Sequence, residues 1–102
     1  MTLRELLDGV AAGLDDVDLA GGQDGGVTWS RYGRPFAAVG GGGEAAEFAL
    51  DPAVAAAAAR TPDVGSSTRG PGWVQFRPGT LDDHARDRAT AWFESAHRRL
   101  GR

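Results

Sequence analysis

Residues 27–38 read Val-Thr-Trp-Ser-Arg-Tyr-Gly-Arg-Pro-Phe-Ala-Ala, and this stretch predicts a β-hairpin. Its first six residues alternate in character and are rich in β-branched and aromatic side chains, which is typical of a strand. Gly33-Arg34-Pro35 predicts a tight turn, and Phe36–Val39 predicts the second strand. The hairpin therefore places an antiparallel strand pair in the fold.

Outward from this hairpin, the chain predicts helices and further short strands. Thr2 and Glu5 are spaced as in a capping box at the start of a helix. The other predicted elements are, in chain order, a helix over about 3–13, an edge strand or loop at 15–18, a strand over 45–50, a helix from Asp51 to about Arg60, a strand over 73–77 and a last helix capped by Thr80. Residues 20–26 and 63–72 are predicted as loops. The short turns favour an α+β fold, with an antiparallel sheet of about four to five strands packed on one face by N-terminal, middle and C-terminal helices.

The composition limits both the size of the protein and its partners. At 102 residues, the chain predicts a single domain covering residues 1–102. It contains no Lys, Asn or Ile, which indicates a GC-rich bacterial genome and leaves Arg as the only strong cation. The net charge is −3, with nine acids and three arginines in residues 1–51 and five acids and eight arginines in residues 52–102. This balance disfavours tight nonspecific DNA binding, which depends on neutralising several phosphates.

Targeting and redox signals point to the cytoplasm. Charged residues interrupt the segment Met1–Asp8, which argues against a signal peptide, and no run approaches the ~18 apolar residues of a membrane span. The chain has no cysteine, which excludes a disulfide framework, a cysteine zinc site and a thiol nucleophile. We therefore expect a cytoplasmic chain without membrane contact.

Three motifs invite a chemical interpretation, and each has a plainer one. Gly40–Gly43 lacks the Lys-Ser/Thr that a phosphate loop requires, so it predicts a hairpin tip. His84 and His97 lie on the last helix, where a solvated helix face explains both. The hydroxyls of residues 66–68 lack the Gly-x-Ser-x-Gly pattern of a nucleophile elbow. We therefore predict no catalytic, cofactor-binding or metal-binding residues.

Aromatic and arginine side chains on two strands predict a binding surface. Strand alternation places Trp29 and Arg31 on one face, and it places Trp73 on the face opposite Val74 and Phe76. If helices cover the Val74 face, both tryptophans lie on the open face beside arginines, suited to stacking and to pairing with phosphate or carboxylate. The alternative is that the tryptophans cap the core and the arginines only solvate the sheet. The predicted surface comprises Trp29, Arg31, Arg34, Arg69, Trp73, Gln75 and Arg77.

The order of these motifs resembles that of the MmcQ/YjbR-like proteins, which are small bacterial α+β domains. The resemblance covers residues 27–100 and rests on the hairpin, on Phe-Ala-Leu-Asp-Pro at 48–52, on Trp73-Val74 and on the closing helix. It implies a fold like that of CyaY and a double-wing DNA-binding role. The chain departs from the family in carrying Arg34 where Lys is common, in the segment 66–72 and in its short first helix.

The sequence thus predicts a non-enzymatic binding module, with nucleic acid as the first partner class to test. The rival interpretation is a protein-interaction or self-associating regulatory module that uses the same face without binding nucleic acid. An enzyme is the third class, and it requires a pocket in which His84 or His97 meets Asp and Arg side chains. No cofactor is expected.

Overall fold

Three helices and six strands form within residues 1–22 and 24–101, the part of the chain that the computed structural model describes. In chain order they are α1 (Leu3–Ala12), β1 (Asp18–Gly21), β2 (Val27–Arg31), β3 (Arg34–Val39), β4 (Ala46–Ala49), α2 (Pro52–Ala58), β5 (Val64–Ser66), β6 (Trp73–Phe76) and α3 (Asp83–Arg99). The predicted α+β class is confirmed.

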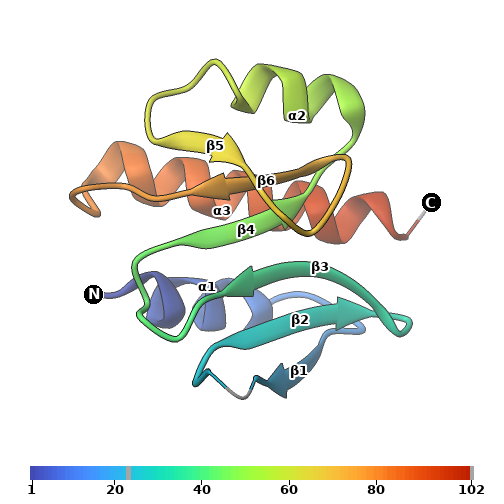
Figure 1. Ribbon diagram of the computed structural model, residues 1–102. Coiled ribbons are helices and arrows are strands. Elements are labelled where there is room, and N and C mark those ends of the chain that lie inside the picture. Colours follow the sequence, from blue (N-terminus) through green and yellow to red (C-terminus); the bar gives the residue numbers. More distant parts are fainter. Residues whose placement is uncertain (23, 102) are drawn as a thin grey trace.

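The described strands join one antiparallel sheet in the order β1-β2-β3-β4-β6-β5 (Figure 1). The predicted count of four to five strands is too low. β1 meets the stretch 15–18, predicted as an edge strand or a loop, only at Asp18, and it extends into residues predicted as a loop. β5 also lies in a stretch predicted as a loop. Their residues are mostly small or polar, so it is backbone pairing with β2 and β6, rather than a side-chain pattern, that makes them strands.

The β2–β3 hairpin turns at Tyr32 and Gly33 rather than at the predicted Gly33-Arg34-Pro35. Both turn residues have positive φ angles, 53° and 76°, and Arg31 pairs with Arg34 across them. Two central residues with positive φ make the type I′ turn, whose twist matches that of paired strands. The predicted turn is wrong because β3 already begins at Arg34.

Side-chain caps begin α1 and α3. Thr2 Oγ1 accepts from the N–H of Glu5, and Glu5 Oε1 accepts from the N–H of Thr2, both at 3.1 Å, which confirms the capping box. The predicted cap of α3 at Thr80 is wrong. Asp82 takes this role, and its Oδ1 accepts from the N–H of Ala85 at 2.9 Å.

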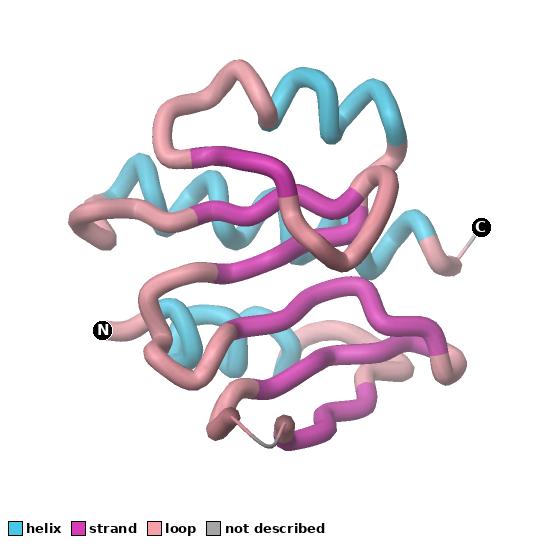
Figure 2. Tube along the Cα trace, viewed as in Figure 1, coloured by secondary structure: helices cyan, strands magenta, loops and turns pink. Residues whose placement is uncertain are grey.

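α1 and α3 lie together behind the sheet and cover one of its faces, while the other face is turned toward the viewer (Figures 1 and 2). α2 lies beside the β5 edge in this view and contributes Ala58 to the core. The largest fully buried side chains of the core are Trp29, Phe36, Phe48, Phe76, Phe93, Leu7 and Leu50. None of the helices in the described part of the chain has the length and apolar character needed to cross a bilayer.

Candidate binding surface

Trp29 lies in the core. Its side chain is fully buried, and its ring meets the ring of Phe93 from α3 edge to face, with 5.2 Å between the centroids. Val27, two residues earlier, is buried on the same side of β2. The face that carries Trp29 is thus the face that α1 and α3 cover. The prediction of an exposed Trp29 is wrong, and the alternative interpretation, a tryptophan of the core, is correct at this position.

Arg31 lies on the same covered face, where it ties β2 to the end of α3. Its Nη1 donates to the carbonyl oxygen of His97 at 2.9 Å and lies 3.2 Å from Nδ1 of that histidine. Nε2 of His97 lies 2.6 Å from the carbonyl oxygen of Asp15. A carbonyl oxygen only accepts, so Nε2 carries the proton and Nδ1 accepts from Arg31. His97 is 6% exposed, and its predicted place on a solvated helix face is wrong.

The opposite face of the sheet carries Trp73 and Gln75, as predicted, since the residues that alternate with them in β6 are buried. Strand pairing sets Gln75 beside Glu47 of β4, and it sets Trp73 beside Ala49. Glu47 is absent from the predicted surface. The signal that finds it is the alternation of residues 45–50, which puts Glu47 on the face away from the core.

Glu47 holds the loop between β5 and β6 against this face. Its Oε1 accepts from Nε of Arg69 at 3.0 Å, and its Oε2 accepts from the hydroxyl of Ser67. The guanidinium carbon of Arg69 lies 5.3 Å from the centre of a ring of Trp73, within cation–π range. Figure 1 shows the loop passing in front of β6 and β4 before the chain enters β6. We call these four residues the Glu47 cluster.

Two alanines show that this face is partly covered. Ala38 and Ala49 are 1% and 5% exposed, although they alternate with core residues and lie outside the cluster that packs under the helices. Ala38 pairs with Glu47 and Ala49 pairs with Trp73. The sequence predicted an open face, whereas the structure gives a face on which the Glu47 cluster shields the centre.

The two other predicted arginines are exposed. Arg77 donates from Nη1 to Glu44 at 3.0 Å, and the two side chains are 58% and 75% exposed. A hollow of about 160 Å³ joins this pair to Glu47 and Gln75. Arg34 lies apart from them, at the start of β3 beside the hairpin turn. The residues that share one surface are Glu44, Glu47, Arg69, Trp73, Gln75 and Arg77, and we call this surface the β4–β6 face.

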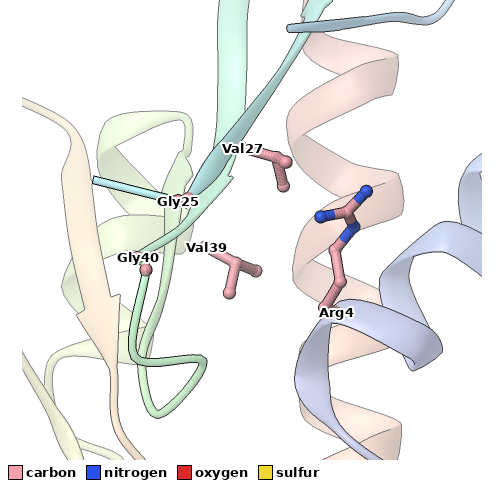
Figure 3. Close-up of a pocket in the computed structure, with 7 residues that line it drawn as sticks. Arg4, Gly25, Val27, Val39 and Gly40 are labelled. Carbon is pink, nitrogen blue, oxygen red and sulfur yellow. The ribbon is translucent and has the colours of Figure 1, made fainter. Parts of the chain in front are cut away.

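A second hollow, of about 140 Å³, lies between α1 and the sheet. Figure 3 shows Arg4, Val27 and Val39 around it. Arg4 is the one charged side chain among its described lining residues, and its Nε donates to Asp8 at 2.8 Å. A third hollow, near the N-terminus, measures about 220 Å³. Pockets that enclose small molecules usually have volumes of roughly 300–1,000 Å³, so none of these hollows favours such a ligand.

Asp24 joins the two glycine-rich loops beside the second hollow. Its Oδ1 accepts from the N–H of Gly26 at 2.9 Å. Hydrogen bonds from the backbone N–H groups of Gly26 and Gly41 hold the pKa of the Asp24 carboxyl below its ordinary value. A Cβ on Gly41 would meet the carbonyl oxygen of Asp24 at 1.9 Å, so only glycine fits at this close approach.

Neither metal ligands nor known relatives indicate a function. Within residues 1–22 and 24–101, no group of three His, Cys, Asp or Glu side chains is placed to hold a metal ion. Comparisons with models of known protein families, with curated proteins and with solved structures give no match for the chain. The role of the β4–β6 face must therefore be inferred from its own residues.

Proposed function

We propose that this protein is a non-enzymatic binding module whose β4–β6 face holds a protein partner. The observation that carries the proposal is the pairing of charges on this face, Arg69 with Glu47 and Arg77 with Glu44. A face with both signs of charge suits a partner surface that also carries both, because complementary charges set the register of an interface. Trp73 adds a half-buried aromatic ring, and aromatic and arginine side chains are enriched at protein interfaces.

The surroundings of His97 support a role outside catalysis. This histidine does meet Arg31 and the backbone of Asp15, which is part of the grouping that an enzyme requires. Both of its ring nitrogens are already engaged, however, and it lines none of the three hollows described above. A general base must reach a substrate, so we assign these side chains to the fold.

Nucleic acid is the second candidate partner, and one observation favours it. The Arg69 guanidinium lies over the Trp73 ring beside a sheet face, and single-strand-binding proteins combine cations with aromatic stacking. The resemblance to MmcQ/YjbR-like proteins, which implies DNA binding, points the same way. Protein is the better-supported partner because Arg69 and Arg77 are each already paired with a carboxylate and because the net charge of the chain is −3.

Site-specific crosslinking tests the proposal. A photoreactive benzoylphenylalanine replaces Gln75 on the β4–β6 face, and a matched control carries it at exposed Ala91 on α3. After irradiation in bacterial cells, we expect a defined protein adduct from the probe at position 75 and none from the probe at position 91. We expect Trp73→Ala to reduce the yield of the adduct from position 75. Adducts between two copies of the chain would identify self-association. Identical products at both positions, or only background, would overturn the proposal.

A titration with a fluorescent single-stranded oligonucleotide at low salt separates the second candidate from the first. Nucleic-acid binding predicts an affinity that falls steeply with salt and that both Arg69→Ala and Arg77→Ala reduce. Protein binding predicts no saturable signal at micromolar chain concentration. A salt-sensitive signal that both substitutions abolish would replace protein by nucleic acid as the proposed partner.

A further inference from the structure

We infer that Glu47 and Trp73 form a binding site for a guanidinium group, which Arg69 of the chain itself fills until an arginine of the partner displaces it. This inference rests on the proposed function, because it names the partner group that the β4–β6 face recognises. The ligand is an arginine side chain exposed on a protein surface.

The two sides of the site match the chemistry of a guanidinium. A carboxylate binds the N–H groups in the plane of this group, and an aromatic ring binds its face. Glu47 accepts from Nε of Arg69 at 3.0 Å, while the guanidinium carbon lies 5.3 Å from the ring centre of Trp73. The structure thus shows the site with an internal ligand in place.

The site remains assembled when the Arg69 side chain leaves. Glu47 is 17% exposed on β4, a strand paired on both sides, and the hydroxyl of Ser67 donates to its second oxygen. That hydroxyl in turn accepts from the backbone N–H of Arg69 at 3.1 Å, a contact that does not depend on the Arg69 side chain. The carboxylate therefore keeps its orientation without the Arg69 guanidinium.

The Arg69 side chain is free to move without moving the strands. It is 38% exposed and lies in the loop before Gly70 and Gly72, which have φ angles of 133° and 80°. The loop is fixed beyond this point to the residue that follows β4, since the N–H of Leu50 donates to the carbonyl oxygen of Gly72 at 2.9 Å. Exposed ion pairs are weak, so a ligand that makes the same two contacts competes with Arg69.

Other arginines near aromatic rings lack this combination of accessibility and chemistry. Arg88 lies over Phe76 at 5.4 Å, but that ring is fully buried. Arg31 lies 5.2 Å from the Tyr32 ring, but its guanidinium is bonded to His97. Arg86 on α3 lies outside the β4–β6 face and has a carboxylate partner in Asp83, and within residues 1–22 and 24–101 its guanidinium lies over no aromatic ring. It therefore provides a matched control.

The experiment vacates the site and offers it a free guanidinium. We expect methylguanidinium to shift the NMR signal of the Trp73 indole N–H saturably in Arg69→Ala. The dissociation constant in wild type is expected to be about tenfold higher, since the tethered Arg69 competes at high effective concentration. Methylammonium and sodium chloride at equal ionic strength serve as probe controls. Arg69→Lys, which keeps the charge without the planar fork, provides a second variant if Arg69→Ala does not fold.

Two further variants decide the outcome. Arg69→Ala combined with Glu47→Gln is expected to lose the saturable shift, while Arg86→Ala is expected to behave as wild type. Equal shifts with and without Glu47, or equal shifts with methylammonium, would overturn the guanidinium site. Blocked Gly-Arg-Gly and Gly-Lys-Gly peptides extend the test to side chains, and the arginine peptide alone is expected to bind Arg69→Ala. If methylguanidinium binds but position 75 crosslinks to no protein, the site stands and the proposed function fails.

Discussion

Two tryptophans of the same sheet lie in contrasting surroundings. Trp29 is fully buried under α3, where its ring meets Phe93, whereas Trp73 is half-buried on the opposite face beside Arg69. The free energy gained by burial grows with the apolar area removed from water, and removal of a buried ring also leaves a cavity. The two residues therefore contribute to stability in different degree, and only Trp73 is accessible to a partner.

We predict that Trp29→Ala lowers the free energy of unfolding by about 3–5 kcal/mol, the range for deletion of a buried aromatic side chain. Trp73→Ala is expected to cost about 1–2 kcal/mol, because much of this side chain already meets water. Urea unfolding followed by circular dichroism measures both values. A Trp73 variant as unstable as the Trp29 variant would contradict the assignment of Trp29 to the core and Trp73 to the surface.

Arg31 is predicted to stabilise the folded state through its hydrogen bonds to His97. Arg31→Met keeps most of the aliphatic stem but removes the donor to the His97 carbonyl oxygen, so we expect a loss of about 1–3 kcal/mol in the free energy of unfolding. Arg34→Met, at an exposed position, is the control and is expected to change stability by less than about 0.5 kcal/mol. Nitrogen NMR of wild type should show the proton of His97 on Nε2, and a proton on Nδ1 alone would rule out the described contact.

The carboxyl of Asp24 provides a prediction on pH. Its pKa is lowered in the folded state by the N–H groups of Gly26 and Gly41, so the folded state binds this proton less readily than the unfolded chain does. Its stabilising effect is therefore complete above the ordinary carboxyl pKa and is lost as pH falls through the lowered one. We expect Asp24→Asn to be less stable than wild type at pH 7, with the difference shrinking between about pH 5 and pH 2. Urea midpoints across this range measure it, and a constant difference would exclude the shift.

At the scale of single elements, local signals predict some boundaries well and others poorly. The capping box of Thr2 and Glu5 is a local pattern, and the structure contains it. The sequence does not indicate the position of the β2–β3 turn, because Tyr32 occupies a position where type I′ turns favour Asn or Gly. Pro35 instead suggests a turn later in the chain. The Tyr32 conformation is supported from a distance, since its hydroxyl donates to Asp16 at 2.9 Å. No neighbouring residue in the sequence signals that contact.

Glycine at the second turn position is predicted to matter for its backbone angle alone. A Cβ on Gly33 would meet nothing within 4 Å, but φ is 76°, where an L side chain is strained. We expect Gly33→Ala to cost about 1 kcal/mol of unfolding free energy. Gly42→Ala in the β3–β4 loop is the control, since Gly42 has equal space and no such φ. Thermal or urea unfolding measures both, and equal effects would contradict a type I′ turn.

At the scale of the whole molecule, strand alternation tells which residues share a face but not which face the helices cover. That choice depends on packing of α1 and α3 against the sheet, which joins residues far apart in sequence. For this reason the sequence predicts Trp29 and Trp73 on one surface, although they lie on opposite faces. The Glu47 cluster is also nonlocal, because its strands β4 and β6 are paired in the sheet although α2 and β5 separate them along the chain. The sequence predicts Arg69 and Trp73 as members of the surface, but not Ser67 or Glu47.

The strand order predicts a gradient of stability across the sheet, which amide hydrogen exchange measures. β3 and β4 lie at the centre and carry Phe36 and Phe48 into the core, so their bonded amides are expected to exchange only through global unfolding. β1 is exposed at all four residues and β5 has three residues, and both lie at edges, so their amides are expected to exchange by local fraying at rates at least tenfold higher. The amides of β6 should resemble β4, because β6 pairs on both sides although it lies far along the chain from β4. Protection of β1 amides equal to that of β4 amides would show that β1 is not an edge strand. Fast exchange of the β6 amides would contradict the pairing of β4 with β6 on which the proposed site depends.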